Sequence, residues 1–374
     1  MKKTILSFAT FASTMIGVGF FSLPYLASRL GFWTMVVYLF AMAAIAIIIH
    51  LIFSRLVLKA PDYSRFPGFV GFYLGKNWKK IGFLTSTIGM LGAMLAYLII
   101  GGEFLANIFS PVFGGSYTIY ILIYFFIGAA LIFSGIRIVE KIELWGLVLF
   151  IVALVFIFIK GLPVFDVSNL FMVHSQSFNV HNLFLAFGPI LFSFWGISVV
   201  PEMEEQLKDN KQQLKKVIPA GILTALVVYL VFIIVVYGIC GRYVTPDALS
   251  GLKMFLTRDA LIVGFLFGII ATFTSFISIG LTLKKIFKYD LKIPEILSWF
   301  IACFVPLAFF FIGFKNFIQV IGFVGGIVLS LDGILICLMY QRLRRTKKAK
   351  TLTSILALVF ILAIICEIKY FLIK

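Results

Sequence analysis

The sequence predicts an all-α integral membrane protein, a bundle of helices that crosses a lipid bilayer many times. Of its 374 residues, 62% are hydrophobic and only 13% are charged, and the mean hydropathy is +1.12. Soluble domains are roughly 45–50% apolar, so no water-soluble fold could bury this much apolar surface. Because one membrane helix needs about 20 apolar residues, the chain is long enough for roughly ten crossings.

Apolar runs separated by turn or charge signals predict the individual helices. The first run begins after Lys3, continues to about Leu30 and lacks the small-residue cleavage site of a signal peptide, so we expect it to be retained. The expected spans are 4–29, 31–58, 81–109, 117–135, 141–160, 182–200, 214–240, 259–287, 293–312, 316–340 and 351–372.

The formal net charge of +17 is explained by the membrane topology and does not indicate nucleic-acid binding. Most of the 32 Lys and Arg residues lie in the loops on one side of the predicted bundle, as the positive-inside rule requires. This places the chain in the cytoplasmic (inner) membrane, with the N-terminus cytoplasmic and the C-terminus extracytoplasmic. The longest outer loops, 161–181 and 241–258, are expected to hold short surface helices that could form a lid.

Two predicted spans are interrupted in the same way. The first contains Gly19 followed after four residues by Pro24, and the sixth contains Gly196 followed after four residues by Pro201. Glycine loosens a helix and proline removes a backbone donor, so each segment is expected to unwind and expose N–H and C=O groups. The alternative is a pair of ordinary kinks, since glycine and proline are common in membrane helices.

The placement of these breaks predicts an inverted repeat. The second break lies five spans after the first, so the sixth span enters the membrane from the side opposite to the first. Interrupted helices at corresponding positions of two repeats point to a binding site near the bilayer midplane. The predicted organisation is a first repeat over 1–160, an outer loop over 161–181, a second repeat over 182–340, and an inner loop with a peripheral eleventh helix over 341–374.

Three separated motifs carry a family resemblance. The segment from Ser13 to Tyr25, STMIGVGFFSLPY, resembles the first-helix signature of the amino acid/auxin permease group, which includes bacterial aromatic and hydroxy amino acid permeases. The segments Phe192–Gly196 and Val200–Glu205 are similar to the sixth helix and following loop of that group, and Thr274-Ser275-Phe276 is similar to its Thr-Ser-Phe stretch. The group lies within the amino acid-polyamine-organocation superfamily.

The resemblance implies a leucine-transporter-like fold and a function. The fold would be a 5+5 inverted repeat with an eleventh transmembrane helix, and the function would be secondary active transport of amino acids by alternating access, as ion-coupled symport. The alternative is a transporter-like amino acid sensor that binds without transport. We expect no enzyme activity, because no loop offers an activated nucleophile, a His-rich cluster or paired aspartates. No obligate protein partner and no cofactor beyond a coupling ion are expected.

An amino acid needs donors for its carboxylate and acceptors for its ammonium, because unpaired charge in a low-dielectric site is costly. The N–H groups of Gly17, Val18 and Gly19 begin a half-helix, whose N-terminus favours anions, so we expect them to cradle the carboxylate. Carbonyls around Phe192 and Ser193 are expected to receive the ammonium. The candidates for the side-chain pocket are Tyr97, Phe194 and Trp195.

The coupling ion is less closely specified. The hydroxyls of Thr274 and Ser275, with carbonyls near Ser13, Ile16 and Ala271, match the positions where sodium-coupled relatives hold sodium. The alternative is that these hydroxyls bond back to their own helical turn. Some proton-coupled relatives place a lysine in the fifth helix, and the fifth span has no lysine at mid-depth, which favours sodium over a proton.

Acidic residues within spans are functional candidates by default. Glu103 is expected to carry a proton or to line the outer access path, Asp332 to pair with a neighbouring helix, and Glu367 to lie at the membrane interface. His50 is expected to make a helix contact. The acidic run after the second break is followed by lysines, so ion pairing explains it better than a metal site. The four cysteines, Cys240, Cys303, Cys337 and Cys366, show no metal or redox spacing.

Overall fold

The computed structural model describes residues 2–60, 65–135, 152–171 and 180–372, and within these ranges it contains helices and no strand. Nine helical segments in the described ranges are long and apolar enough to cross a membrane, and one bent pair adds a tenth. The unbroken ones are α3 (Phe32–Val57), α5 (Lys76–Phe113), α6 (Tyr117–Ser134), α11 (Leu214–Cys240), α12 (Arg258–Lys285), α13 (Glu295–Ile312) and α16 (Lys347–Leu372). Ten of the expected spans are thereby confirmed.

The expected fifth span, 141–160, falls largely outside the described residues. The described part is the apolar helical segment Val152–Val164, which ends in the short 3-10 helix η2 (Leu162–Val164). The outer loop that follows carries the short helix α8 (Ser168–Phe171), and the later outer loop carries η5 (Gly241–Tyr243) and η6 (Ser250–Met254). Short helices in both outer loops were expected from the sequence.

The first span is broken as the sequence predicts. It consists of α1 (Lys2–Met15), the 3-10 helix η1 (Val18–Ser22) and α2 (Leu23–Leu30), with a bend of 44°. The sixth span consists of α9 (Val180–Ser193), the 3-10 helix η3 (Ile197–Val199) and α10 (Val200–Gln206). Both breaks are therefore unwound segments and not ordinary kinks.

The tenth span has an irregularity that was not expected. It runs from α14 (Phe317–Phe323) through the π-helix η8 (Val324–Leu329) into α15 (Ser330–Leu343). Gly188 of α9 packs directly on this π-helix, and a methyl group on Gly325 would collide with the Gly188 carbonyl. The glycines let the two backbones approach more closely than larger residues would allow.

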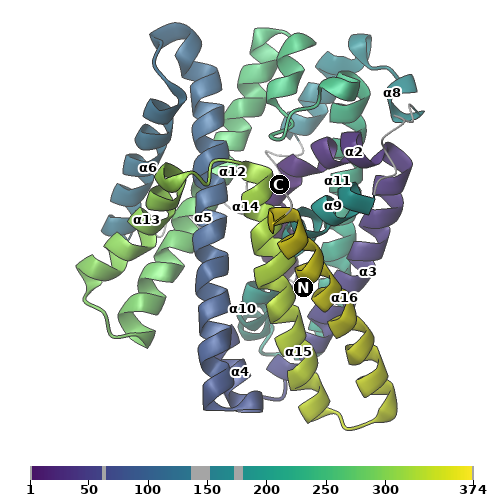
Figure 1. Cartoon of the computed structure of the whole chain (residues 1–374), viewed down its shortest axis with the longest axis vertical. Helices are drawn as coiled ribbons and strands as arrows, with labels where there is room; N and C mark the ends of the chain where they lie inside the picture. The colour runs from purple at the N-terminus through teal and green to yellow at the C-terminus, as the bar shows by residue number, and fades with distance from the viewer. Residues whose placement is uncertain (1, 61–64, 136–151, 172–179, 373–374) are drawn as a thin grey trace.

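The long helix α5 forms the axis of the arrangement (Figure 1). It packs against α6, α12 and α13 on one side and against the tenth span on the other. The helices α3, α9 and α11 enclose the two breaks, and α16 lies against α15 at the edge. One end of the bundle holds α4 (Phe66–Leu74) and the turn between α15 and α16, and we call it the α4 end. The opposite end holds α8, and we call it the α8 end.

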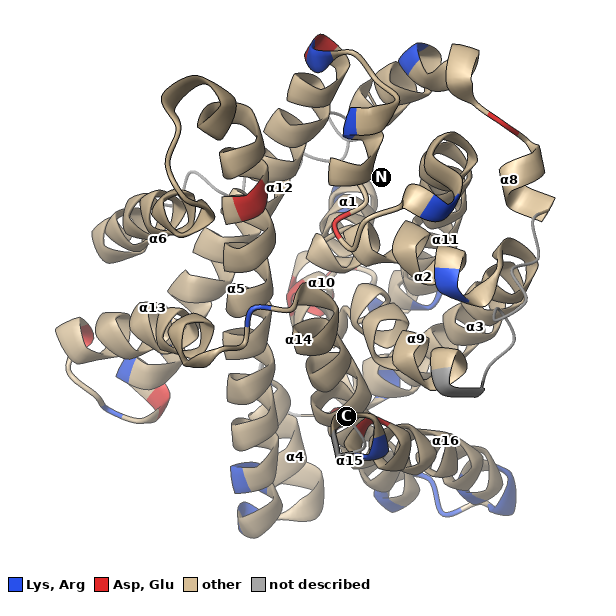
Figure 2. Ribbon diagram, turned by 45° about the horizontal axis from the view of Figure 1, so that its top comes forward, with Lys and Arg blue, Asp and Glu red and all other residues tan. Residues whose placement is uncertain are grey.

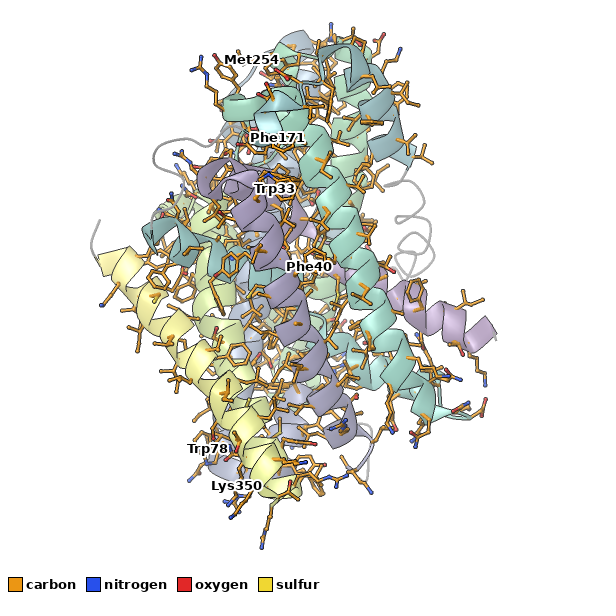
Figure 3. All side chains as sticks on the ribbon, turned by 90° about the vertical axis from the view of Figure 1, so that its right-hand side faces the viewer. Trp33, Phe40, Trp78, Phe171, Met254 and Lys350 are labelled. Atoms are coloured by element: carbon orange, nitrogen blue, oxygen red, sulfur yellow. The ribbon has the colours of Figure 1, made fainter. Side chains whose placement is uncertain are left out.

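The surface fits a bilayer. Figure 2 shows that Lys and Arg lie mainly near helix ends. Figure 3 places Trp33 and Phe40 along the outward face of α3, where their side chains are 57% and 54% exposed. Trp78 and Lys350 both lie at the α4 end (Figure 3). Apolar side chains at mid-span and aromatic and basic ones near the ends are typical of membrane proteins.

Candidate functional site

The two breaks touch each other in the centre of the bundle. A methyl group on Gly19 would lie 2.5 Å from Ser193 Oγ and 2.9 Å from Phe192 Cδ1. These residues come from the first and the sixth span, so only tertiary packing brings them together. Glycine is needed at this point because any side chain would occupy the space between the two breaks.

The break in the first span presents unpaired backbone donors. The Gly17 N–H donates to the Met15 carbonyl at 2.8 Å, whereas the N–H groups of Val18 and Gly19 have no acceptor among the described residues. They open the 3-10 helix η1, so they also lie at the positive end of a helical dipole. Tyr97 of α5 lies beside them, and a methyl group on Gly17 would sit 2.8 Å from its hydroxyl oxygen. This part of the site can therefore receive a carboxylate.

Two backbone carbonyls converge on one tyrosine. The hydroxyl oxygen of Tyr229, on α11, lies 2.6 Å from the Met15 carbonyl oxygen and 2.6 Å from the Ser193 carbonyl oxygen. Tyr229 is fully buried. A phenol has one hydrogen-bonding proton, so it donates to one of these carbonyls at a time. Tyr229 thus holds the ends of α1 and α9 together, and the carbonyl oxygens of Met15 and Ser193 can still accept further hydrogen bonds.

A histidine holds the break in the sixth span. The His50 Nε2 atom, on α3, accepts a hydrogen bond of 3.0 Å from the Gly196 N–H, and Nδ1 lies 2.7 Å from the Ala46 carbonyl oxygen. Nδ1 therefore carries the proton and Nε2 is the acceptor, which is the neutral ring. The predicted helix contact of His50 is confirmed, and its partner is the unwound backbone itself.

The aromatic pocket candidates lie in different surroundings. The Phe194 ring is fully buried and packs edge-on against Tyr229, with 5.1 Å between the ring centroids. The Trp195 ring lies 5.8 Å from the His50 ring on the α3 side. Phe192 is half-buried and adjoins Gly19. The structure brings Gly17, Gly19, Tyr97, Phe192 and Ser193 together. The rings of Phe194 and Trp195 pack instead against Tyr229 of α11 and His50 of α3.

The candidate sodium ligands come from two helices that are not closely packed in this conformation. The main contacts of α1 in the described chain are with α11 and α10, and not with α12. The Thr274 hydroxyl donates within its own helix, to the carbonyls of Ile270 at 3.0 Å and Ala271 at 3.2 Å. Ser13 on α1 likewise bonds to the Thr10 carbonyl at 3.1 Å. Neither hydroxyl is directed at an ion-binding site in this arrangement.

Glu103 lies on α5 beneath the loop that joins α11 to α12. The loop carboxylate of Asp247 and the ammonium of Lys253 are within electrostatic range of it. Asp247 is almost fully buried and accepts hydrogen bonds from the Thr245 hydroxyl and from the N–H and hydroxyl of Ser250. Burial raises the pKa of Asp247 above its ordinary value. Glu103 therefore faces a loop at the α8 end that carries both an acid, Asp247, and a base, Lys253.

The remaining acids differ in their surroundings. Glu367 was expected at the membrane interface, but its side chain is 2% exposed and packs on Gly322 and Gly326 of the tenth span. Glu204, after the second break, pairs with Lys211, which confirms the predicted ion pairing of the acidic run. Within the described residues no cluster of His, Cys, Asp and Glu could hold a metal ion.

Sequence reasoning missed Tyr229 as part of the site. Nothing in the pattern of α11 distinguishes this tyrosine from the other aromatic residues of the chain. The position of Tyr229 is the signal that could have identified it. It lies at mid-span of the helix that follows a broken span, where a buried hydroxyl needs a polar partner and the unwound backbone offers one.

Comparison with known proteins agrees with this geometry. The chain is 24% identical over 343 residues to the "Tyrosine-specific transport system 1" of Haemophilus influenzae, a match that covers 87% of this chain and 84% of that protein. Its fold is similar to the crystal structure of MhsT in complex with L-phenylalanine, with a TM-score of 0.63, 16% identity and 97% of each chain covered. The leucine-transporter-like fold is thereby confirmed. A profile of the tryptophan/tyrosine permease family matches residues 1–373, and the chain therefore belongs to that family of membrane transporters.

Proposed function

We propose that the chain is a secondary active transporter that carries aromatic amino acids across the cytoplasmic membrane by alternating access. The contact between Gly19 and Ser193 carries this proposal, because it places unpaired N–H groups of one break beside carbonyls of the other. Membership of a tryptophan/tyrosine permease family, a tyrosine-specific relative and a phenylalanine-bound protein of similar fold support the substrate class.

The binding mode follows from the charges of the substrate. The carboxylate takes the N–H groups of Val18 and Gly19, with the Tyr97 hydroxyl as a further donor beside Gly17. The ammonium takes the carbonyls of Met15 and Ser193, where Tyr229 already satisfies one acceptor at a time. The aromatic ring packs against Phe192. Each charged group thus meets backbone of opposite partial charge, which offsets its loss of hydration.

We further propose that transport is ion-coupled symport, with sodium as the coupling ion. The ligands would be the hydroxyls of Thr274 and Ser275 with backbone carbonyls near Ser13, Ile16 and Ala271. Because Thr274 now donates to its own helix, sodium binding requires α1 to approach α12 and the hydroxyl to turn outward. That movement is a closure of the α4 end, and it supports a link between ion binding and alternating access.

The orientation and the repeats complete the proposal. The α4 end holds the basic turn between α15 and α16, so we assign it to the cytoplasm by the positive-inside rule, with the C-terminus outside. The helices of 1–160 and of 182–340 would form the two inverted repeats, since each begins with a broken span.

Uptake by purified protein in proteoliposomes tests this function. The panel is labelled tyrosine, tryptophan, phenylalanine, alanine and glutamate, with sodium and pH gradients imposed separately. We expect uptake of the aromatic three and stimulation by sodium. Uptake independent of sodium at fixed pH would remove the proposed roles of Thr274 and Ser275. Saturable tyrosine binding without any uptake would favour the alternative, a sensor.

A further inference from the structure

Asp332 is a buried acid that the amino acid site does not use. Its side chain is 5% exposed. At 1.5 Å per residue it lies about 22 Å from one end and about 16 Å from the other end of the span Phe317–Leu343, close to mid-membrane. An ionised carboxylate enclosed at that depth without a cation is strongly disfavoured. Its position therefore needs an explanation.

Asp332 has one hydrogen-bond partner among the described residues, the hydroxyl of Thr85 on α5. The Thr85 Oγ1 atom lies 2.5 Å from Asp332 Oδ1 and 3.2 Å from the Gly82 carbonyl oxygen. A threonine hydroxyl has one proton and can also accept. When Asp332 is ionised, Thr85 donates to it. When Asp332 is protonated, the carboxyl donates to Thr85, and Thr85 donates to Gly82.

Both protonation states thus keep the Thr85 hydroxyl and the Oδ1 atom of Asp332 hydrogen-bonded. The change from one to the other needs a rotation of the Thr85 hydroxyl and no movement of the backbone. An isolated carboxyl in an apolar contact would lack this second arrangement. The pair is therefore built to exist in two protonation states.

No cation compensates Asp332 within the described residues. The elements that pack against α15 are α3, α4, α5, α16 and η8, and their titratable groups are engaged elsewhere. His50 bonds to Gly196, Arg55 donates to the hydroxyl of Tyr340, Tyr73 donates to the Leu56 carbonyl, and Glu367 packs on the glycines of the tenth span. The lysines of α5 at positions 76, 79 and 80 and those of α16 at positions 347, 348, 350 and 369 are all exposed.

Asp332 also adjoins a part of the bundle that is linked to the binding site. It follows the π-helix η8 directly, and this π-helix packs backbone-to-backbone on α9 through Gly325 and Gly188. The α9 helix ends at Ser193, in the break of the sixth span. π-Helical segments occur frequently at functional sites. A change at Asp332 therefore acts on a helix that touches the substrate-binding half-helix.

We propose that Asp332 and Thr85 form a proton-binding site that takes up and releases one proton in each transport cycle. The proton comes from water and adds to the Asp332 carboxylate, which becomes neutral, and it returns to water when the carboxylate re-forms. The closed contact of α5 with α15 favours the neutral form. A conformation that separates these helices admits water and favours release. This inference extends the proposed function, whose transport cycle supplies the conformational change.

The transport test compares Asp332→Asn with wild type in proteoliposomes that hold the same sodium concentration inside and outside, so that no sodium gradient drives transport. Counterflow, in which labelled tyrosine exchanges with unlabelled tyrosine inside, needs no net proton movement. Accumulation driven by an inside-alkaline pH gradient does need it. We expect the variant to keep counterflow and to lose accumulation, while the matched control Glu367→Gln keeps both. Accumulation that persists in Asp332→Asn, or that is absent from a wild type active in counterflow, would overturn the proposal.

Infrared spectroscopy tests the site without any substrate. Wild type at neutral pH should show the C=O band of a protonated carboxyl group that Asp332→Asn lacks. Thr85→Val removes the hydrogen bond and should shift this band, whereas Thr85→Ser keeps the hydroxyl and should leave it in place. Identical spectra of wild type and Asp332→Asn at every pH would overturn the proton site. If wild type shows the band but exchanges no amino acid, the proposed substrate fails and the proton site stands.

Discussion

The two breaks share one sequence signature, yet the structure holds them differently. In the sixth span the Gly196 N–H is bound by His50, and Ser193 and Phe194 are almost fully buried. In the first span Gly17 is partly accessible, and the N–H groups of Val18 and Gly19 have no acceptor in the described chain. Unwinding alone therefore does not make a binding site. We infer that the sixth-span break is the supported half of the site and the first-span break is the half that awaits its ligand.

The largest effect is expected from filling the space between the breaks. Gly19→Leu places a side chain where Ser193 and Phe192 now lie, so we expect a folded protein without tyrosine uptake. The matched control is Gly89→Ala, whose methyl group would meet Val328 at an ordinary 3.6 Å. The control should transport normally, with equal or higher stability because alanine favours a helix. Normal uptake by Gly19→Leu would show that the breaks do not form the site.

Removing the hydroxyl that joins the breaks should have the next largest effect. Tyr229→Phe removes the one hydroxyl proton that the carbonyls of Met15 and Ser193 share, and the Met15 carbonyl keeps the Gly17 N–H as a donor. We expect a loss of about 1–3 kcal/mol of stability and lower transport. Tyr237→Phe is the matched control on the same helix, since the Tyr237 hydroxyl is buried without a partner in the described chain. Thermal unfolding in detergent measures the stability of both variants relative to wild type. Equal shifts for the two variants would contradict a special role of Tyr229.

The support of the sixth-span break is tested at His50. His50→Phe keeps a ring of similar size but removes the acceptor of the Gly196 N–H, so we expect a loss of about 1–3 kcal/mol of stability. Transport should fall less than in Gly19→Leu, because the ligand-binding N–H groups belong to the other break. Loss of transport in a His50→Phe variant that keeps wild-type stability would mean that His50 contacts the substrate.

The smallest effect is expected at the exposed end of α1. Lys3 pairs there with Asp209, and both side chains are more than half exposed. The Lys3 ammonium lowers the pKa of Asp209, so the pair persists at neutral pH and is lost only as the pH falls through that lowered pKa. Asp209→Asn should leave the melting temperature and uptake unchanged, because exposed ion pairs contribute little. A clear change in uptake would show that this pair restrains the movement of α1.

The sequence was sufficient to predict the helical membrane fold and both breaks, because apolar run length and the glycine-to-proline spacing are local features. Gly17, Gly19 and Ser193 could be placed in the site for the same reason. The roles of Tyr229, His50 and Thr85 depend on which helix faces which, and apolar membrane helices show little periodicity that would reveal their facing sides. The π-helix before Asp332 likewise results from packing on α9, and no local signal predicted it.

Hydrogen exchange measured by mass spectrometry tests the contrast between the breaks most directly. The amides of residues 16–20 and of residues 194–198 would be followed in the full-length protein, with and without tyrosine. We predict that tyrosine slows exchange at Val18 and Gly19 and leaves Gly196, already bound by His50, unchanged. Protection confined to the sixth-span break, or protection of neither break by a transported amino acid, would contradict the account.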